Sequence, residues 1–224
     1  MIVRHGEQGG RIWMVGKANQ LAARGYRAVV VALRGYGSST GDYHTFGVQE
    51  RDDMQRVIDA LEAHNLSSDY LGAMGNSYGA AVAIQLAAAD PRIDVVVAQS
   101  AFSSLRRVVP SFSRTMVPVL GWMLSEQQFD AIVDAAGEIA SFDPDEADTV
   151  AAMRLTRAPV LLIHGQWDWI VPPDHADRLL AAGDNRTELV RIPAAGHVGV
   201  FLDVDGKVSR ASLNWIERWR DDGT

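Results

Sequence analysis

Short runs of β-branched and other apolar residues alternate along this chain with longer stretches of helical pattern. The runs predict six strands, at residues 2–4, 28–33, 70–74, 95–99, 160–164 and 188–192. Helical stretches lie between and after them, near 12–24, 48–64, 78–89, 174–182 and 207–220. The strand runs are continuously apolar, as expected for strands that helices cover on both faces. The alternation predicts an α/β fold built on a mostly parallel sheet of about six strands.

Composition narrows the class of protein. With 224 residues, of which 47% are apolar and 22% charged, the chain is expected to form one globular domain over residues 1–224. Its net charge of −7 argues against nucleic-acid binding, which favours a basic surface. Cysteine is absent, which excludes disulfides and thiolate chemistry. No apolar run reaches the ~20 residues of a membrane span. A cytoplasmic location is therefore expected if Met1 is the true start.

One segment interrupts the alternation of strands and helices. Residues 101–155 carry no strand signal, although a simple crossover between parallel strands needs only about a dozen residues. Residues 115–153 contain eight acidic side chains and no lysine or arginine. Four of these acids, Glu126, Asp130, Asp134 and Glu138, recur every four residues and share one helical face, which predicts a solvated surface. We expect a small helical cap inserted at about 102–155.

A candidate nucleophile follows the third predicted strand. The sequence Gly75-Asn76-Ser77-Tyr78-Gly79 runs from that strand into a helix. A sharp strand-to-helix turn would hold Ser77 in a strained conformation, and side chains at Gly75 or Gly79 would collide with neighbouring backbone. The helix N-terminus would direct free N–H groups toward the serine oxygen. The alternative is that Ser77 only caps the helix.

A serine nucleophile needs a general base, and the base needs an acid that orients it. Asp168 follows the predicted strand 160–164, and His197 follows the strand 188–192. Both therefore lie just beyond the carboxyl ends of strands, where open α/β sheets carry their sites. Asp168 could instead cap the turn before Val171-Pro172, and His164 is expected to be structural and to hold the loop of Asp168.

The order Ser77, Asp168, His197 resembles that of the α/β-hydrolase fold serine hydrolases. His5-Gly6 and the segments 21–26 and 33–38 add to the resemblance, which runs nearly end to end. It implies an acyl-serine mechanism that needs no metal or organic cofactor. It also implies an oxyanion hole made by the backbone N–H groups of Tyr78 and Glu7.

Several other histidines and aromatic residues are not expected to take part in the chemistry. His44, His64 and His175 are expected at the surface, and no pair of histidines has metal-ligand spacing. Tyr36, Trp167 and Trp169 are expected to pack rather than to contact substrate. The cap is expected to roof a hydrophobic pocket with eight apolar side chains: Phe112, Met116, Val117, Val119, Leu120, Trp122, Met123 and Leu124.

Hydrolysis of a carboxylic ester with a small or medium acyl group is the favoured function, because it needs only the triad and the oxyanion hole. A serine aminopeptidase is the main alternative, in which the acidic cap holds the substrate amine. Thioesterase, lactonase and C–C hydrolase activities stay open, as does a non-catalytic binding protein. The run Val3-Arg4-His5-Gly6-Glu7 also resembles the motif of histidine phosphatases, but that reading leaves Ser77 and its partners unexplained.

The resemblance carries one further expectation. Related proteins open with an edge hairpin ahead of the strand that ends in His5-Gly6, and here that strand starts at residue 2. The run 28–33 would then be an exposed, uncharged edge strand that pairs with another copy of the chain. The alternatives are that another segment covers this edge or that Met1 is internal to a longer protein.

Overall fold

The computed structural model describes residues 2–4 and 10–221, with side chains from Met14 onward. Six parallel strands form one sheet in the order β2-β1-β3-β4-β5-β6. The strands are β1 (Ile2–Arg4), β2 (Val29–Val31), β3 (Gly72–Asn76), β4 (Val95–Gln99), β5 (Val160–Gly165) and β6 (Thr187–Ile192). The predicted parallel α/β fold is confirmed.

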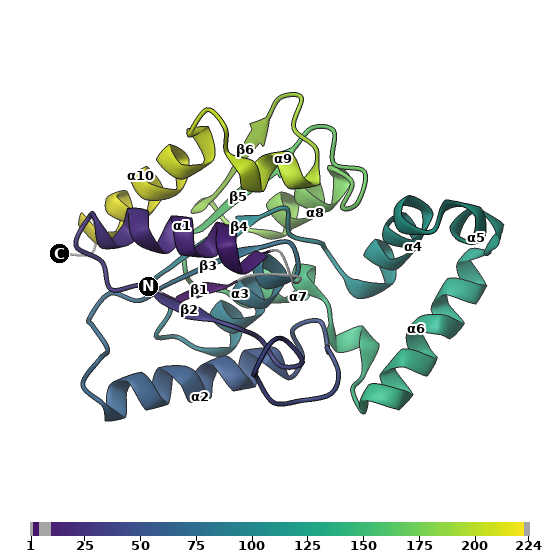
Figure 1. Ribbon diagram of the computed structural model, residues 1–224, viewed down its shortest axis with the longest axis horizontal. Coiled ribbons are helices and arrows are strands. Elements are labelled where there is room, and N and C mark those ends of the chain that lie inside the picture. Colours follow the sequence, from purple (N-terminus) through teal and green to yellow (C-terminus); the bar gives the residue numbers. More distant parts are fainter. Residues whose placement is uncertain (1, 5–9, 222–224) are drawn as a thin grey trace.

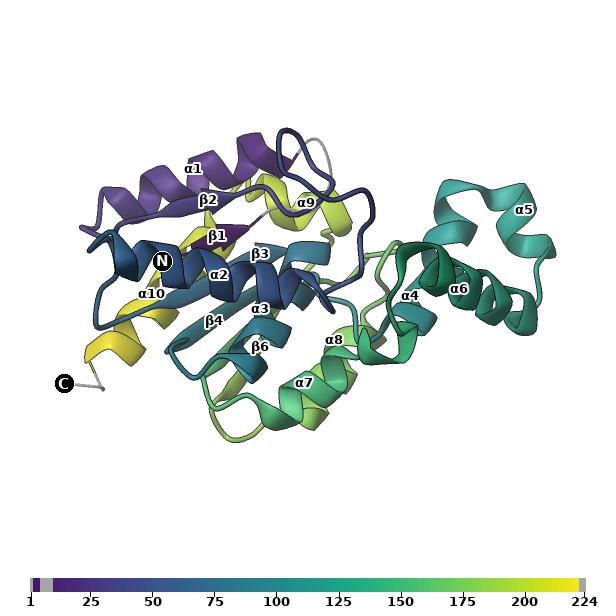
Figure 2. The ribbon, with the colours of Figure 1, turned by 90° about the horizontal axis from the view of Figure 1, so that it is seen from below.

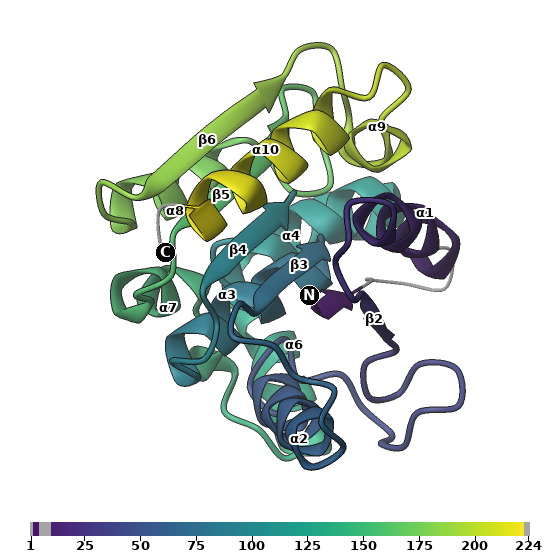
Figure 3. The same cartoon turned by 90° about the vertical axis from the view of Figure 1, so that its left-hand side faces the viewer.

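Helices cover both faces of the sheet (Figure 3). One face is covered by α1 (Gly10–Ala22), α9 (His197–Leu202) and α10 (Lys207–Asp221). The other is covered by α2 (Glu50–Ala63), α3 (Tyr78–Ala89), α7 (Thr149–Leu155) and α8 (Asp174–Ala182). Strand β4 shows why its sequence is continuously apolar. Val95 and Val97 join one buried cluster, while Val96 and Ala98 join the cluster on the opposite face.

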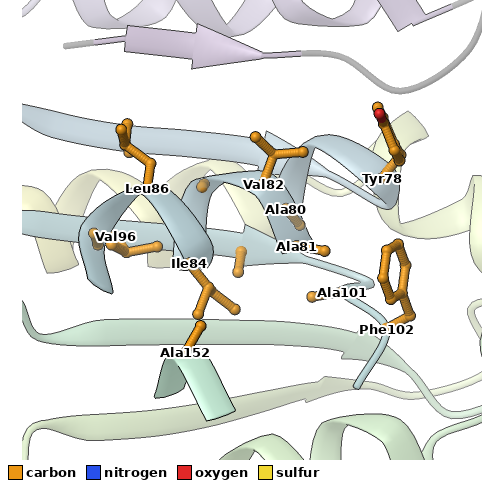
Figure 4. Close-up of a cluster of buried hydrophobic side chains, with 14 of the residues drawn as sticks. Tyr78, Ala80, Ala81, Val82, Ile84, Leu86, Val96, Ala101, Phe102 and Ala152 are labelled. Atoms are coloured by element: carbon orange, nitrogen blue, oxygen red, sulfur yellow. The ribbon is translucent and has the colours of Figure 1, made fainter. Parts of the chain in front are cut away.

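Helix α3 lies against the centre of the sheet (Figure 4). Its residues from Tyr78 to Ala87 are buried, and Ala80, Ala81 and Ala83 are fully enclosed. Small side chains at these positions let the helix approach β3 and β4 closely. This close packing fixes the start of α3, which directly follows Ser77, relative to the carboxyl end of the sheet.

The helices between β4 and α7 lie apart from the sheet (Figures 1 and 2). They are α4 (Leu105–Met116), α5 (Pro118–Met123) and α6 (Glu126–Ala140), followed by a short 3₁₀ turn, η1 (Pro144–Glu146). Ser125 and Gln128 form a reciprocal capping box that starts α6. We call residues 105–140 the α4–α6 segment. The division of the chain into a core and a cap at about 102–155 stays a prediction.

Strand β2 lies at one edge of the sheet that the described residues form, and β6 at the other. The prediction that a second copy of the chain pairs with the edge strand stays a prediction. Across residues 2–4 and 10–221, no helix combines the length and the apolar character that crossing a membrane requires.

Candidate active site

Ser77 lies in a strained turn at the end of β3. Its φ of 50° and ψ of −117° are unusual for a residue with a side chain. The Ser77 N–H donates to the carbonyl of Gln99 at 2.7 Å, and the Ser77 side chain does not cap α3. A Cβ at Gly75 would lie 2.2 Å from the Gly79 carbonyl oxygen. The turn that the sequence predicts is therefore confirmed, including its need for glycine at position 75.

The structure brings the three predicted triad side chains together. His197 Nδ1 lies 2.7 Å from Asp168 Oδ2, and His197 Nε2 lies 2.9 Å from Ser77 Oγ. A carboxylate can only accept, so Nδ1 carries the imidazole proton and Nε2 accepts from the serine hydroxyl. This tautomer is the one in which histidine can take a proton from serine.

Asp168 is fixed by its own loop. It is 2% exposed, and its Oδ1 accepts from the N–H groups of Ile170 at 3.1 Å and Val171 at 2.8 Å. The carboxylate therefore caps the turn with one oxygen and contacts His197 with the other. His164 Nε2 lies 2.8 Å from the carbonyl oxygen of Val171, and burial lowers the pKa of His164. His164 thus donates to this loop as a neutral ring, which agrees with the structural role predicted for it.

The loops that carry Asp168 and His197 are joined through their backbones. The N–H of Trp167 donates to the carbonyl of Ala195 at 2.9 Å, and that of Gln166 donates to Ile192 at 3.1 Å. A Cβ at Gly165 would lie 2.4 Å from the Ala195 oxygen, so glycine is required for this approach. These contacts set the spacing between the carboxylate and the imidazole.

Tyr78 is the first residue of α3, and the first N–H groups of a helix have no partner inside it. Its backbone can therefore donate to an oxygen bound near Ser77. Burial and the nearby Glu50 carboxylate raise the pKa of the Tyr78 phenol, which stays neutral. Glu7, the second oxyanion donor that the resemblance implies, lies outside the described residues.

Ser77 and His197 line a cavity of about 390 Å³. Among the described lining residues none carries a carboxylate. They are Tyr36, His44, Phe46, Asn76, Ser77, Tyr78, Phe102, Val108, Val109, Phe112, Met116, Ile170, Val171, His197, Val198 and Phe201. The cavity wall is therefore mostly apolar, and Ser77 and His197 are among its few polar residues.

The α4–α6 segment contributes one wall and is anchored to the loop of Asp168. Ser111 Oγ donates to the carbonyl of Ile170 at 3.2 Å, and Thr115 Oγ1 donates to that of Trp169 at 2.9 Å. Both donors belong to α4, which also supplies Phe112 and Met116 to the cavity. The position of α4 is thus linked to the loop that carries Asp168.

Several expectations about individual residues are wrong. His44 is half-buried in the cavity wall and His175 is 2% exposed, although both are predicted at the surface. Trp167 and Trp169 are 60% and 75% exposed rather than packed. Tyr36 packs against the buried core, as predicted, and it also lines the cavity. Tyr36 and His44 belong to a glycine-rich loop after the carboxyl end of β2, and that position is the signal that could have identified them.

The predicted roof is also smaller than expected. Of its eight apolar side chains, Phe112 and Met116 line the cavity, while Val119, Trp122 and Met123 are 73–78% exposed. The acidic face of α6 is solvated, as predicted, and is partly neutralised by arginines of α4. Arg106 bonds to Asp134 at 2.7 Å and Arg114 to Glu126 at 2.6 Å.

Solved structures with this fold include hydrolases. The esterase Pf2001 of Pyrococcus furiosus is similar with a TM-score of 0.74 and 19% identity, over 98% of this chain and 81% of the esterase. The meta-cleavage product hydrolase of Pseudomonas fluorescens IP01 is similar with a TM-score of 0.70 and 18% identity, over 97% of this chain and 90% of that hydrolase. At this level of identity the likeness shows the fold, which is the α/β-hydrolase fold.

The family follows from the sequence. The protein-family model described as X-Pro dipeptidyl-peptidase (S15 family) matches residues 5–138, which are more than half of the chain. The chain therefore belongs to this family. It is thus a hydrolase of the α/β-hydrolase fold, as the resemblance implied. The matched segment includes Ser77 and ends before Asp168 and His197.

Two curated relatives extend the comparison. The uncharacterized protein YfhR of Escherichia coli (strain K12) is 27% identical over 198 residues, which are 86% of this chain and 61% of YfhR. Protein bem46 of Schizosaccharomyces pombe is 31% identical over 146 residues, which are 64% of this chain and 42% of bem46. The chain therefore spans less than two thirds of the length of these relatives.

Proposed function

We propose that this chain hydrolyses carboxylic esters with a small or medium acyl group, through an acyl-serine intermediate on Ser77. The observation that carries the proposal is the pair of hydrogen bonds from Ser77 to His197 and from His197 to Asp168, at the wall of an apolar cavity. An apolar cavity with a few polar groups in its wall is the usual form of a site for a neutral organic substrate.

The first half of the reaction forms the acyl-serine. Ser77 Oγ attacks the ester carbonyl carbon while its proton passes to His197 Nε2. The N–H of Tyr78 donates to the carbonyl oxygen as negative charge develops there. Asp168 stabilises the imidazolium. His197 then gives its proton to the leaving alkoxide oxygen, and the C–O bond of the ester breaks to release the alcohol.

The second half returns the enzyme to its starting state. A water molecule transfers a proton to His197 Nε2 and attacks the acyl carbon. The bond from that carbon to Ser77 Oγ breaks, and the serine oxygen takes the proton back from His197. The products are the free acid and a regenerated Ser77 hydroxyl.

A serine peptidase is the second candidate, because the family is described by an X-Pro dipeptidyl-peptidase activity. A peptidase that holds a substrate amine needs a carboxylate near the nucleophile. The acids of α6 do not line the cavity, and Asp134 and Glu126 are paired with Arg106 and Arg114. This arrangement favours a neutral ester over a charged amine. The esterases among the structural neighbours also support this proposal.

Labelling with a fluorophosphonate tests the nucleophile, and the chain offers a matched control. Ser103 Oγ lies 2.8 Å from His175 Nδ1 but is fully buried away from the cavity. We expect labelling of the native chain, no labelling after Ser77→Ala, and unchanged stoichiometry after Ser103→Ala. Label that remains after Ser77→Ala would refute the assignment.

A substrate panel decides between ester and peptide. Methyl and p-nitrophenyl esters of two- to eight-carbon acids are compared with aminoacyl- and X-Pro-p-nitroanilides. We expect kcat/KM to be higher for the esters, and Ser77→Ala to abolish both activities. Faster cleavage of either anilide by the native chain would put the peptidase first.

A further inference from the structure

The cavity beside Ser77 holds an unusual share of the aromatic residues of the chain. Aromatic side chains make up 8% of all residues, but six of the sixteen residues that line the cavity are phenylalanine or tyrosine. Four of the six phenylalanines of the chain are among them, at positions 46, 102, 112 and 201. Tyr36 and Tyr78 complete the set.

The rings come from separate elements. Tyr36, His44 and Phe46 belong to the loop between β2 and α2, and Tyr78 starts α3. Phe102 follows β4, in the same packed region as Tyr78 (Figure 4). Phe112 and Phe201 come from α4 and α9. Rings from five separate parts of the described chain therefore line this one cavity.

The aromatic rings near Ser77 contact one another both face to face and edge to face. Tyr36 and His44 stack with centroids 4.2 Å apart and planes 12° apart. Phe46 stands perpendicular to Tyr78, with centroids 5.5 Å apart. Phe201 meets the His197 ring edge-on at 5.0 Å. Stacked and perpendicular pairs are the geometries that aromatic rings prefer, so the wall offers further rings a favourable contact.

The buried core of the sheet is packed in a different way. The cluster on the α1, α9 and α10 face consists mainly of aliphatic side chains such as Val95, Val97 and Ile163, with one fully buried Trp215. By contrast, Phe112 in the cavity wall is 40% exposed, and Tyr36, Phe46 and Phe201 are only half-buried. These rings therefore keep surface that a bound molecule can cover.

We infer that the cavity is an aryl subsite, and that this enzyme takes esters in which one aromatic ring lies close to the reacting carbonyl. The inference rests on the proposed esterase function and names its substrate class. The volume of about 390 Å³ is near the lower end for ligand cavities, which suits a single ring on a short linker. The ring can belong to the acid or to the alcohol, and the experiment separates these sources.

Matched pairs of esters test aromatic recognition apart from hydrophobicity. Methyl phenylacetate is compared with methyl cyclohexylacetate, and benzyl acetate with cyclohexylmethyl acetate, by titration of the released acid. Each pair has the same carbon skeleton, but only one member is flat and aromatic. We expect kcat/KM to favour the phenyl member about tenfold in one pair. Equal or faster cleavage of the cyclohexyl member in both pairs would overturn the inference.

Two tyrosines of one loop supply the variant and its control. Tyr36 lines the cavity, whereas Tyr43 is 50% exposed and does not. We expect Tyr36→Leu to reduce the phenyl preference about threefold or more, and Tyr43→Leu to leave it unchanged. An unchanged preference in Tyr36→Leu would count against the inference.

The fluorophosphonate label and the hydrolysis of methyl butyrate separate the two proposals. If the native chain shows neither labelling nor hydrolysis of methyl butyrate, the proposed esterase function itself is refuted. Normal labelling and methyl butyrate turnover without a phenyl preference refute only the aryl subsite.

Discussion

The strands at the centre of the sheet are completely buried, whereas the α4–α6 segment leaves several large apolar side chains exposed. Strands β3, β4 and β5 are buried along their whole length. In the α4–α6 segment, Val119, Trp122 and Met123 are 78%, 73% and 76% exposed. The candidate catalytic residues Ser77, Asp168 and His197 are held by the densely packed region, because they follow strands of the sheet or start helices that cover it. The α4–α6 segment contributes a wall of the cavity.

The sheet region also contains a buried ion pair that differs from the exposed pairs of Arg106 in the α4–α6 segment. Around the sheet, Lys17 is almost fully buried and pairs with Asp203 at 3.0 Å, joining α1 to the turn before α10. In the α4–α6 segment, Arg106 pairs with carboxylates that are more than half exposed. Solvent weakens exposed pairs far more than buried ones. We therefore expect substitutions around the sheet to have large effects on catalysis and stability, and equivalent substitutions in the α4–α6 segment to have small ones.

The largest expected effect is that of Asp168→Asn. The Oδ1 of Asp168 accepts two backbone N–H groups, so the amide oxygen would keep that place and the NH₂ group would face His197 Nδ1. This group donates, which leaves Nδ1 without its proton and Nε2 unable to accept from Ser77. We expect kcat to fall on the order of 10⁴-fold, as for the wrong imidazole tautomer.

Asp130→Asn is the matched control for this substitution. Asp130 lies on the exposed face of α6 and meets Arg106 at 3.6 Å. Its replacement should leave kcat unchanged in the same ester assay. A fall of less than tenfold in Asp168→Asn, or a fall of similar size in both variants, would contradict the comparison of the two regions.

Alanine substitutions at two glycines compare how tightly the two regions are packed. A Cβ at Gly75 would lie 2.2 Å from the backbone oxygen of Gly79, and a Cβ at Gly121 would lie 2.6 Å from the backbone of Ser113. Gly75→Ala has to displace a buried helix, so we expect a loss of about 3 kcal/mol or more in the free energy of unfolding. Gly121→Ala moves the exposed α5 from α4, and we expect a loss of about 1 kcal/mol.

Urea unfolding followed by circular dichroism measures both losses. Gly16→Ala, in α1 with open space around the added methyl group, is the control and should be neutral or slightly stabilising. Gly121→Ala should also retain full fluorophosphonate labelling. A larger loss in Gly121→Ala than in Gly75→Ala would show that the α4–α6 segment is packed as tightly as the sheet region.

Burial also makes the sheet region sensitive to acid. Burial lowers the pKa of His175 from its ordinary value of about 6.5 to about 4, and its Nδ1 accepts from the Ser103 N–H at 3.0 Å. Between pH 6.5 and 4 the unfolded chain therefore binds a proton that the folded chain does not. The free energy of unfolding should fall across this window as the pH falls, by up to about 3 kcal/mol from this residue.

Replacing His175 tests this assignment. His175→Gln should make the fall in the free energy of unfolding at acid pH smaller. Part of the fall should remain, because the pKa of the buried His164 is also lowered. His64→Gln, at an exposed position, is the control and should retain the full loss. Urea unfolding at pH 7, 6, 5 and 4 gives the comparison, and identical pH profiles for both variants would refute the role of His175.

The sequence predicts the sheet well, and it identifies three loop residues that the structure brings together, because both depend on local patterns. A strand of continuous apolar residues, followed by a loop with Ser77, Asp168 or His197, predicts where each side chain emerges. The carboxyl ends of parallel strands share one edge, so their convergence needs no further information.

The cavity wall is not predictable in this way. Its rings lie as far apart in the chain as Tyr36 and Phe201, and only the packing of separate elements brings them together. The partners of the acidic residues are also not predictable from the sequence pattern. Residues 115–153 contain no basic side chain, but Arg106 and Arg114 lie just before this run and meet its acids across the α4–α6 segment. Charge pairing between elements is a tertiary property that the linear pattern does not record.

The smallest expected effect is that of Arg106→Gln, which tests whether the charges of the α4–α6 segment matter for its stability. The Arg106 guanidinium lies 2.6 Å from Asp145, 2.7 Å from Asp134 and 3.6 Å from Asp130, so one cation joins α4 to α6 and to η1. All three carboxylates are more than half exposed, which limits the gain to about 1 kcal/mol in the free energy of unfolding. We expect this loss in low salt and its disappearance near 1 M NaCl, where screening acts over about 3 Å. A loss above about 3 kcal/mol, or one that salt does not reduce, would mean that the network acts as a buried one and that the two regions do not differ in the way described.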